Sequence, residues 1–225
     1  MDRSSKITGK NRGGGVCFYV NERRLEREQR TVKIWSEASN SSIQACFEYS
    51  CELTLDTNTA NRKLKLSENN RKVTFVEEDQ PYPDHPERFD SWYPQLLCRD
   101  GLTGRCYWEV ERKRGVSISV SYGGIRRRGG NNECVFGYND QSWSLICSEV
   151  GYSVRHSNRG PSISSSSVSG RVAVYVDCPA GFLSFYTVSS DSLIHLHTFN
   201  TTFTQPLYPG FGLLSYGSSV SLYPV

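Results

Sequence analysis

The sequence lacks the features that mark membrane proteins and helical bundles. Its 225 residues include one methionine, and no run of about 18 apolar residues is present that could span a bilayer. Long stretches rich in Ala, Leu, Glu and Lys are also missing, whereas 12% of the residues are aromatic. This balance favours strands and turns over helices, so we expect an all-β domain.

The N-terminus lacks the apolar core of a secretory signal peptide, since it begins MDRSSKITGKNRGGG. The formal net charge is +3, with acids and bases spread through the chain, so the basic footprint of a nucleic-acid binder is missing as well. We therefore expect a soluble, cytoplasmic protein without a nucleic-acid partner and without membrane insertion.

The cysteines lack the spacing of a zinc site, because neither a CxxC pair nor a Cys/His cluster occurs. Their wide scatter and the expected reducing compartment predict free buried thiols and no disulfide. The eight are Cys17, Cys46, Cys51, Cys98, Cys106, Cys134, Cys147 and Cys178. No metal and no cofactor is predicted.

The sequence does contain short runs in which apolar and polar residues alternate. From residue 51 onward these runs recur between turn signals, as in an antiparallel sandwich. The predicted strands are residues 53–55, 72–76, 106–111, 116–122, 134–138, 142–147, 171–176, 182–188, 193–199 and 220–223. DCPAGF predicts a hairpin turn, and QPLYPGFG (205–212) predicts a loop. Residues 1–49, Gly-rich and then charged, are expected to be a poorly structured segment.

Catalytic patterns are weak. His195 and His197 of LIHLHTF are predicted to share one strand face, but no third metal ligand lies nearby in sequence. A triad could be assembled on paper from Ser184, His195 and Asp177, yet no nucleophile elbow accompanies them. We therefore predict no catalytic residue and no enzyme.

Several motifs resemble the PRY-SPRY domain family over about residues 50–225. LTLDTNTANRKLKLSENNRKVT resembles the PRY half, and GRCYWEVE, WSLIC, RVAVYVDCPAGFLSFYTV and FTQPLYPGFGL resemble the SPRY motifs in their order. The resemblance implies a two-sheet antiparallel β-sandwich of the concanavalin-like jelly-roll type, with PRY at about 50–100 and SPRY at about 101–225. Its forms in NOD-like receptors, tripartite-motif proteins and stonustoxin-type toxins are the most similar.

The same resemblance implies that CYWEVE is a core strand, with Trp108 and Val110 on one face and Tyr107 and Glu109 on the other. Two positions depart from the family pattern: Thr57 stands where proline is usual, and Cys178 stands where an aromatic residue is common. Neither change conflicts with the fold.

Residues outside the PRY-SPRY match add a second, shorter resemblance. GKNRGGGVCFYVNER (9–23) resembles a fragment of the endonuclease region of LINE-type retrotransposons, which indicates a captured fragment without a complete active site. The zinc ligands and heptads of a tripartite-motif ligase are not found in the sequence, so ligase activity is not carried over.

The family resemblance implies a protein-protein interaction module that binds a partner through variable loops at one end of the sandwich, with innate immune recognition as the expected setting. Flanking motifs place these loops at 83–93, 123–132, 148–159 and 189–197. Aromatic and basic residues contribute most to a desolvated interface. The predicted partner-binding residues are Trp92, Tyr93, Arg126, Arg127, Tyr152 and His197.

Two alternatives stay open at the level of sequence. GGIRRRGG (123–130) could help bind a small anionic ligand if its arginines and His156 or His197 line one basic pocket. The motif is not a P-loop, because the Gly-Lys-Ser/Thr ending is missing. The chain could also be the substrate-recognition part of a ubiquitin ligase whose catalytic domains lie elsewhere.

Overall fold

The structure, a computed structural model, describes residues 48–130, 132–164, 168–189 and 192–224. Within these ranges the predicted all-β class is confirmed, because the strands form two antiparallel sheets and the helical content is one 3-10 turn, Asn132–Cys134. The described part contains no helix with the length and apolar character needed to cross a bilayer. The predicted segment 1–49 lies almost wholly outside these ranges.

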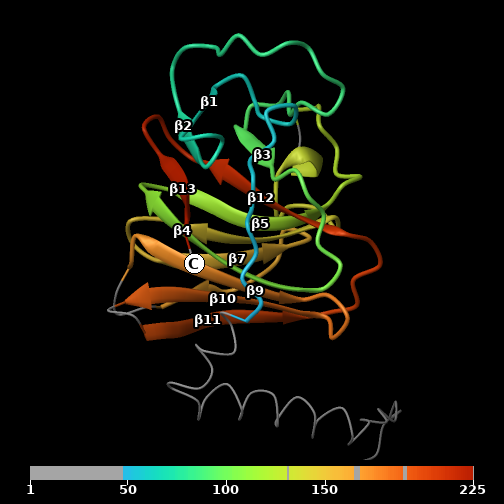
Figure 1. Ribbon diagram of the computed structural model, residues 1–225, viewed down its shortest axis with the longest axis vertical. Coiled ribbons are helices and arrows are strands. Elements are labelled where there is room, and N and C mark those ends of the chain that lie inside the picture. The colour runs from blue at the N-terminus through green and yellow to red at the C-terminus, as the bar shows by residue number, and fades with distance from the viewer. Residues whose placement is uncertain (1–47, 131, 165–167, 190–191, 225) are drawn as a thin grey trace, which may run out of the picture. The chain divides into compact units, whose positions relative to one another are not determined.

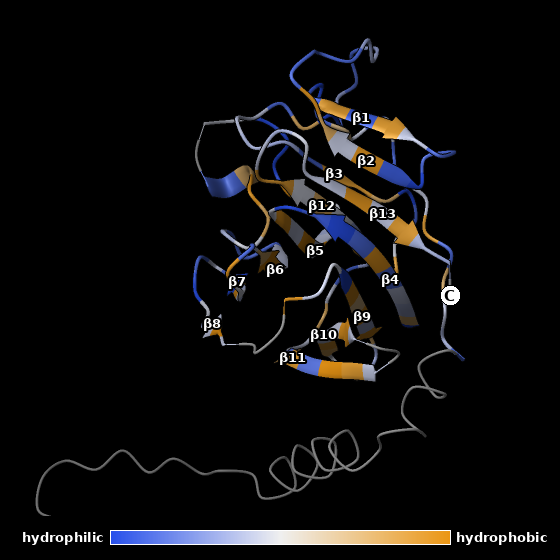
Figure 2. Ribbon diagram, turned by 90° about the vertical axis from the view of Figure 1, so that its left-hand side faces the viewer, coloured by the Kyte–Doolittle hydropathy of each residue, from blue (hydrophilic) through white to orange (hydrophobic). Residues whose placement is uncertain are grey.

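Seven strands form one sheet and six form the other. In Figure 2, β1 and β11 lie at opposite ends of the larger sheet. In spatial order the first is β1 (Leu64–Ser67), β2 (Lys72–Phe75), β13 (Ser219–Tyr223), β4 (Arg105–Lys113), β9 (Arg171–Asp177), β10 (Phe182–Ser189) and β11 (Ser192–Asn200). The second is β3 (Gln95–Leu97), β12 (Leu207–Leu213), β5 (Val116–Tyr122), β6 (Ser142–Cys147), β7 (Tyr152–His156) and β8 (Ser162–Ile163). Figure 1 labels most of these strands.

The core lies between the inner faces of the two sheets, and it follows from period-two alternation. In β5, VSISVSY, Val116 and Ile118 join the main core cluster, whereas Ser117 and Ser119 face outward. In β4, Trp108 and Val110 join the same cluster. The predicted facing of CYWEVE is thereby confirmed.

The outer face of β4 is also buried, which the alternation alone does not predict. Tyr107 and Glu109 are 1% and 2% exposed, and the Tyr107 hydroxyl donates a hydrogen bond to the Glu109 carboxylate. Arg171 forms an ion pair with Glu109 and lies 3.7 Å from the centre of the Tyr223 ring. An otherwise costly buried carboxylate therefore has both a hydrogen-bond donor and a cation beside it.

Two predicted elements are wrong. Residues 134–138 form the end of the 3-10 turn and a further turn, because Phe136 packs on the outer face of the six-stranded sheet with Phe89 and Leu97. QPLYPGFG is no loop, since most of it is strand β12. Its glycines are needed there: a Cβ on Gly210 would lie 2.8 Å from Phe136.

The predicted strand 53–55 is reduced to an isolated bridge between Leu55 and Cys98. Before it, residues 49–51 run beside β4, where the Cys51 amide donates to the Tyr107 carbonyl at 3.0 Å. This segment extends the sheet on the side where β13 ends, since Tyr223 pairs with Glu109 and Ser50 with Tyr107.

The predicted absence of disulfides is a further prediction that the structure contradicts. Cys51 and Cys106 form a disulfide with Cα atoms 5.7 Å apart, because the Ser50–Tyr107 bridge brings their chains side by side. Their separation of 55 residues gave no spacing signal. The predicted free thiols are confirmed at Cys98, Cys134, Cys147 and Cys178, whereas Cys17 and Cys46 lie outside the described residues.

We expect reduction of Cys51–Cys106 to lower the free energy of unfolding by about 2–4 kcal/mol, since the bond closes a long loop in the unfolded chain. Thermal unfolding with and without reductant, together with non-reducing peptide mapping, measures this. Cys178→Ser is the control: its thiol is free, and replacing it should leave the effect of reductant unchanged. Labelling of Cys51 and Cys106 by a thiol reagent in the folded, unreduced protein would contradict the pairing.

Candidate protein-interaction surface

Two of the four predicted binding loops lie side by side. The Asp90 amide donates to the Arg127 carbonyl at 2.7 Å, and Asp90 and Arg128 form a parallel bridge. Loops 83–93 and 123–130 therefore form one surface, which we call the two-loop surface. It covers the outer face of the six-stranded sheet, where Phe89, Ile125 and Phe136 pack with Leu97.

A buried arginine ties loop 83–93 to the first residues of the PRY half, of which the loop is also a part. Arg88 is 5% exposed and donates to the carbonyls of Thr57 at 2.8 Å, Ala60 at 2.6 Å and Pro83 at 2.7 Å. The Asn61 side-chain amide donates to the carbonyls of Phe89 and Ser91, each at 3.2 Å. Sequence reasoning did not single out Arg88 or Asn61, because nothing in their spacing separates them from solvated polar residues.

Trp92 and Tyr93, both predicted binding residues, differ in their surroundings. Trp92 is 65% exposed, and its ring centre lies 5.5 Å from that of Tyr93 in an edge-on arrangement. Tyr93 is only partly exposed: its ring lies against Gly212 of β12, where a Cβ would come within 2.5 Å of it. Burial raises the pKa of the Tyr93 hydroxyl. Tyr93 therefore supports Trp92 and leaves the indole as the exposed aromatic group.

Arg126 and Arg127, adjacent in sequence, have opposite environments. The Arg126 side chain is 70% exposed and forms an ion pair with Glu133. The Arg127 side chain is 10% exposed, donates to the carbonyls of Ile125 at 2.8 Å and Gly123 at 2.9 Å, and pairs with Glu87 at 2.8 Å. Its guanidinium also lies 4.7 Å from the centre of the Phe89 ring. Arg127 joins the two loops, so the prediction that it is an exposed binding residue is corrected.

Tyr152 is also corrected, because it belongs to the core. It begins strand β7 inside the predicted loop 148–159, and it is 3% exposed. Its hydroxyl donates to Thr187 at 3.2 Å and accepts a hydrogen bond from the Ser169 amide at 2.9 Å. A partner bound at the surface cannot reach this side chain.

His197 lies on strand β11, not in a loop, and is half-buried beside Phe199, with ring centres 4.6 Å apart. A register shift leaves Leu196 of β11 without a pairing residue in β10, so His197 pairs with Phe185 but His195 pairs with Tyr186. Phe185 faces the core and Tyr186 does not, so the two imidazoles do not share the strand face that was predicted. Burial lowers the pKa of His197, and nearby His195 lowers it further.

The triad of Ser184, His195 and Asp177 is not formed. Ser184 Oγ and His195 Nε2 each lie 2.8 Å from Thr198 Oγ1, while Asp177 pairs with Arg105 at 2.8 Å. Ser184 and His195 thus share Thr198 as a hydrogen-bond partner, whereas Asp177 pairs with Arg105, so the hydrogen-bond chain of a triad is not formed. The described part of the chain also contains no group of three or more His, Cys, Asp or Glu side chains placed to hold a metal ion.

A polar hollow of about 250 Å³ borders loop 83–93. It carries both charge signs, and its charged lining residues are Arg62, Lys63, Asp79, Asp84, Arg88, Asp90 and Arg128. Neither His156 nor His197 reaches it: His156 stacks on Trp143 with ring centres 4.6 Å apart. The pocket that the small-anion alternative required, lined by arginines and one of these histidines, is thus not formed here.

Arg127→Ala should destabilise the domain by about 1–3 kcal/mol, because it leaves two carbonyls without their donor and removes the link to Glu87. Arg126→Ala is the matched neighbour and should change stability by no more than about 0.5 kcal/mol, since its ion pair is exposed. Urea unfolding of both variants measures the difference. Equal midpoints would show that Arg127 does not hold the loops together.

The described residues thus define a two-sheet sandwich that carries an exposed two-loop surface. Residues 53–102 match the SPRY-associated domain, PRY, and residues 105–223 match the SPRY domain. The chain belongs to the SPRY domain family, in its PRY-SPRY form. Domains of this family are protein-interaction modules.

Relatives include toxin subunits and tripartite-motif proteins. Stonustoxin subunit alpha of Synanceia horrida is 41% identical over 171 residues, which are 73% of this chain and 24% of the relative. Tripartite motif-containing protein 16 of Mus musculus is 35% identical over 192 residues, which are 84% of this chain and 34% of the relative. The chain therefore spans about a third or less of these relatives.

Solved structures give the same assignment of fold. A stonustoxin structure superimposes with a TM-score of 0.76 at 36% identity, covering 80% of this chain and 30% of that one. The crystal structure of the TRIM65 PSpry domain superimposes with a TM-score of 0.73 at 28% identity, covering 81% of this chain and 94% of that one. The comparisons do not support the LINE resemblance of residues 9–23, which lie outside the described ranges.

Proposed function

We propose that this PRY-SPRY domain binds a protein partner through the two-loop surface, with Trp92 as its main contact. The carrying observation is a large aromatic side chain, 65% exposed, on a loop that is fixed from beneath. Such a side chain gains most when a partner desolvates it, and a fixed loop loses little conformational entropy on binding. Membership of a family of interaction modules supports this reading.

The charges around Trp92 indicate which kind of partner surface would fit. Arg126 and Arg128 are exposed on one loop, and Asp84, Glu87 and Asp90 are exposed on the other. A partner that fits must offer an apolar pocket for the indole and a rim with charges of both signs. The mixed hollow beside loop 83–93 supports a protein partner over a small anionic ligand, because acids there offset the bases.

The biological setting is part of the proposal. We place the domain in innate immune recognition, following the family resemblance, with substrate recognition for a ubiquitin ligase as the alternative setting. A non-enzymatic role and the lack of a nucleic-acid partner belong to the same proposal. Cytoplasmic localisation stays a prediction, and the oxidation state of Cys51–Cys106 in protein from cells tests it, because such bonds persist in oxidising compartments.

The experiment compares partner capture by the wild type and by Trp92→Ala, read by quantitative mass spectrometry after cross-linking. A specific partner should be lost by about tenfold or more in the variant, since an aromatic anchor contributes about 1.4 kcal/mol or more. Its melting temperature should stay close to that of the wild type.

Val150→Ala is the matched control, because Val150 is an apolar side chain 94% exposed on another loop. It should capture the same proteins as the wild type. Unchanged capture by Trp92→Ala, or an equal loss with Val150→Ala, would sink the assignment of this surface.

A further inference from the structure

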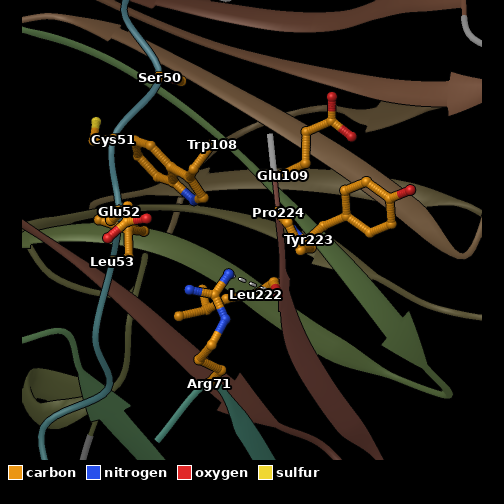
Figure 3. A pocket seen from close by; sticks show the side chains of 10 residues that line it. All are labelled: Ser50, Cys51, Glu52, Leu53, Arg71, Trp108, Glu109, Leu222, Tyr223 and Pro224. Atoms are coloured by element: carbon orange, nitrogen blue, oxygen red, sulfur yellow. Dashed lines mark hydrogen bonds between the residues drawn. The ribbon is translucent and has the colours of Figure 1, made fainter. Parts of the chain in front are cut away.

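A second pocket lies away from the two-loop surface, where the segment before the PRY half crosses the end of the seven-stranded sheet. Its volume is about 160 Å³, and its walls are residues 50–53, Arg71, Trp108, Glu109 and residues 222–224 (Figure 3). One wall is fixed to β4 by the Cys51–Cys106 disulfide and by the hydrogen bond from the Cys51 amide to Tyr107. The pocket is therefore part of the folded scaffold.

The floor of this pocket presents a buried donor that no described residue satisfies. Trp108 is 2% exposed, and its indole Nε1–H has no hydrogen-bond acceptor among the described residues. Figure 3 shows the indole nitrogen turned toward the centre of the pocket. A buried N–H without an acceptor is costly, so its direction into a pocket marks a place for an acceptor from outside the chain.

Arg71 supplies a second donor on the opposite side. It follows a turn of three residues with positive φ, Glu68, Asn69 and Asn70, and its carbonyl accepts a hydrogen bond from the Leu222 amide at 2.8 Å. The half-buried guanidinium makes one long hydrogen bond, 3.4 Å, to the Leu222 carbonyl. Figure 3 shows the guanidinium reaching toward the space that the Trp108 N–H also faces.

The carboxylates of the pocket do not satisfy these donors. Glu109 is held by the Tyr107 hydroxyl and by Arg171, and in Figure 3 its carboxylate turns away from the pocket. Glu52 is exposed at the rim and forms no ion pair with Arg71 in the described structure. The inner part of the pocket is thus rich in donors and positive, whereas its rim carries one acid.

We propose that this pocket binds the carboxylate of a small ligand. Arg71 would donate to the carboxylate oxygens in the forked geometry that guanidinium groups favour, and the Trp108 N–H would donate to one of them. The volume is about ten times the space that a single water needs, so one water does not fill it. This site is separate from the two-loop surface and does not depend on the proposed partner.

The test uses the full chain labelled with ¹⁵N and follows the indole N–H signals of its four tryptophans during titration with sodium acetate. Trp108→Phe assigns the Trp108 signal by its loss. The expected result is a downfield shift of that signal that saturates with acetate, because a new acceptor deshields the proton. Sodium chloride at equal ionic strength should not produce the shift.

Two variants test the charges in opposite directions. Arg71→Gln should weaken acetate binding by about tenfold or more, since it removes the charge-assisted hydrogen bonds. Glu52→Gln should tighten binding by about threefold, since it removes a like charge near the ligand. Arg99→Gln, an exposed arginine outside the pocket lining, is the control and should bind as the wild type does.

Several outcomes would overturn the proposal. A Trp108 signal that does not move shows a pocket filled by water only, and a shift that rises linearly or equally with chloride shows an adventitious ion only. Wild-type affinity in Arg71→Gln overturns the assignment too. If Arg71→Gln loses the dispersed spectrum of a folded domain, the direction of the Glu52→Gln effect decides, because Glu52 is exposed and its change leaves the fold intact.

Discussion

Strand β4 lies in the middle of the seven-stranded sheet, and the burial of both its faces is the constraint on which the other features depend. On the inner face, Trp108 and Val110 pack against the six-stranded sheet. On the outer face, Tyr107 and Glu109 are shielded together with Arg171. A strand buried on both sides tolerates few polar groups without partners. This explains why the outer face is closed by a hydrogen bond and an ion pair. Two buried donors of β4, Trp108 Nε1 and Arg112 Nε, have no acceptor among the described residues, and Trp108 lines a pocket.

Buried arginines hold the loops in place, as apolar packing holds the sheets together. Arg88 and Arg127 donate mainly to backbone carbonyls, so each guanidinium fixes several turns of chain that have no strand partners. Carbonyl acceptors hold a loop in one conformation without requiring a matching side chain. The loop that carries Trp92 is therefore rigid although it is irregular, and a rigid loop is what lets an exposed aromatic residue bind at low entropic cost.

The sheet core could be predicted from the sequence because alternation is a local property. The strands 116–122 and 142–147 were predicted with the bounds that the structure has. Strand β12 could not be predicted in this way. Its glycines, Gly210 and Gly212, are suited to the strand because Phe136 and Tyr93 pack against them, and both aromatic residues come from distant segments. The disulfide could not be predicted for a related reason. The bridge between Ser50 and Tyr107 brings Cys51 beside Cys106, and no local sequence pattern encodes this contact.

The surroundings of the proposed binding residues could be predicted only in part, because residue type does not report burial. Arg126 and Arg127 are chemically identical neighbours, yet one pairs with Glu133 in solvent and the other joins two loops from within. Tyr152 and Trp92 are both aromatic, yet the first fills the core. The two arginines differ in the number of distant acceptors within reach, and the two aromatic residues differ in packing. Both properties depend on tertiary contacts. For the proposed function, the buried arginines that hold the two-loop surface therefore matter as much as the side chain that it exposes, since they keep the loop of Trp92 in one position.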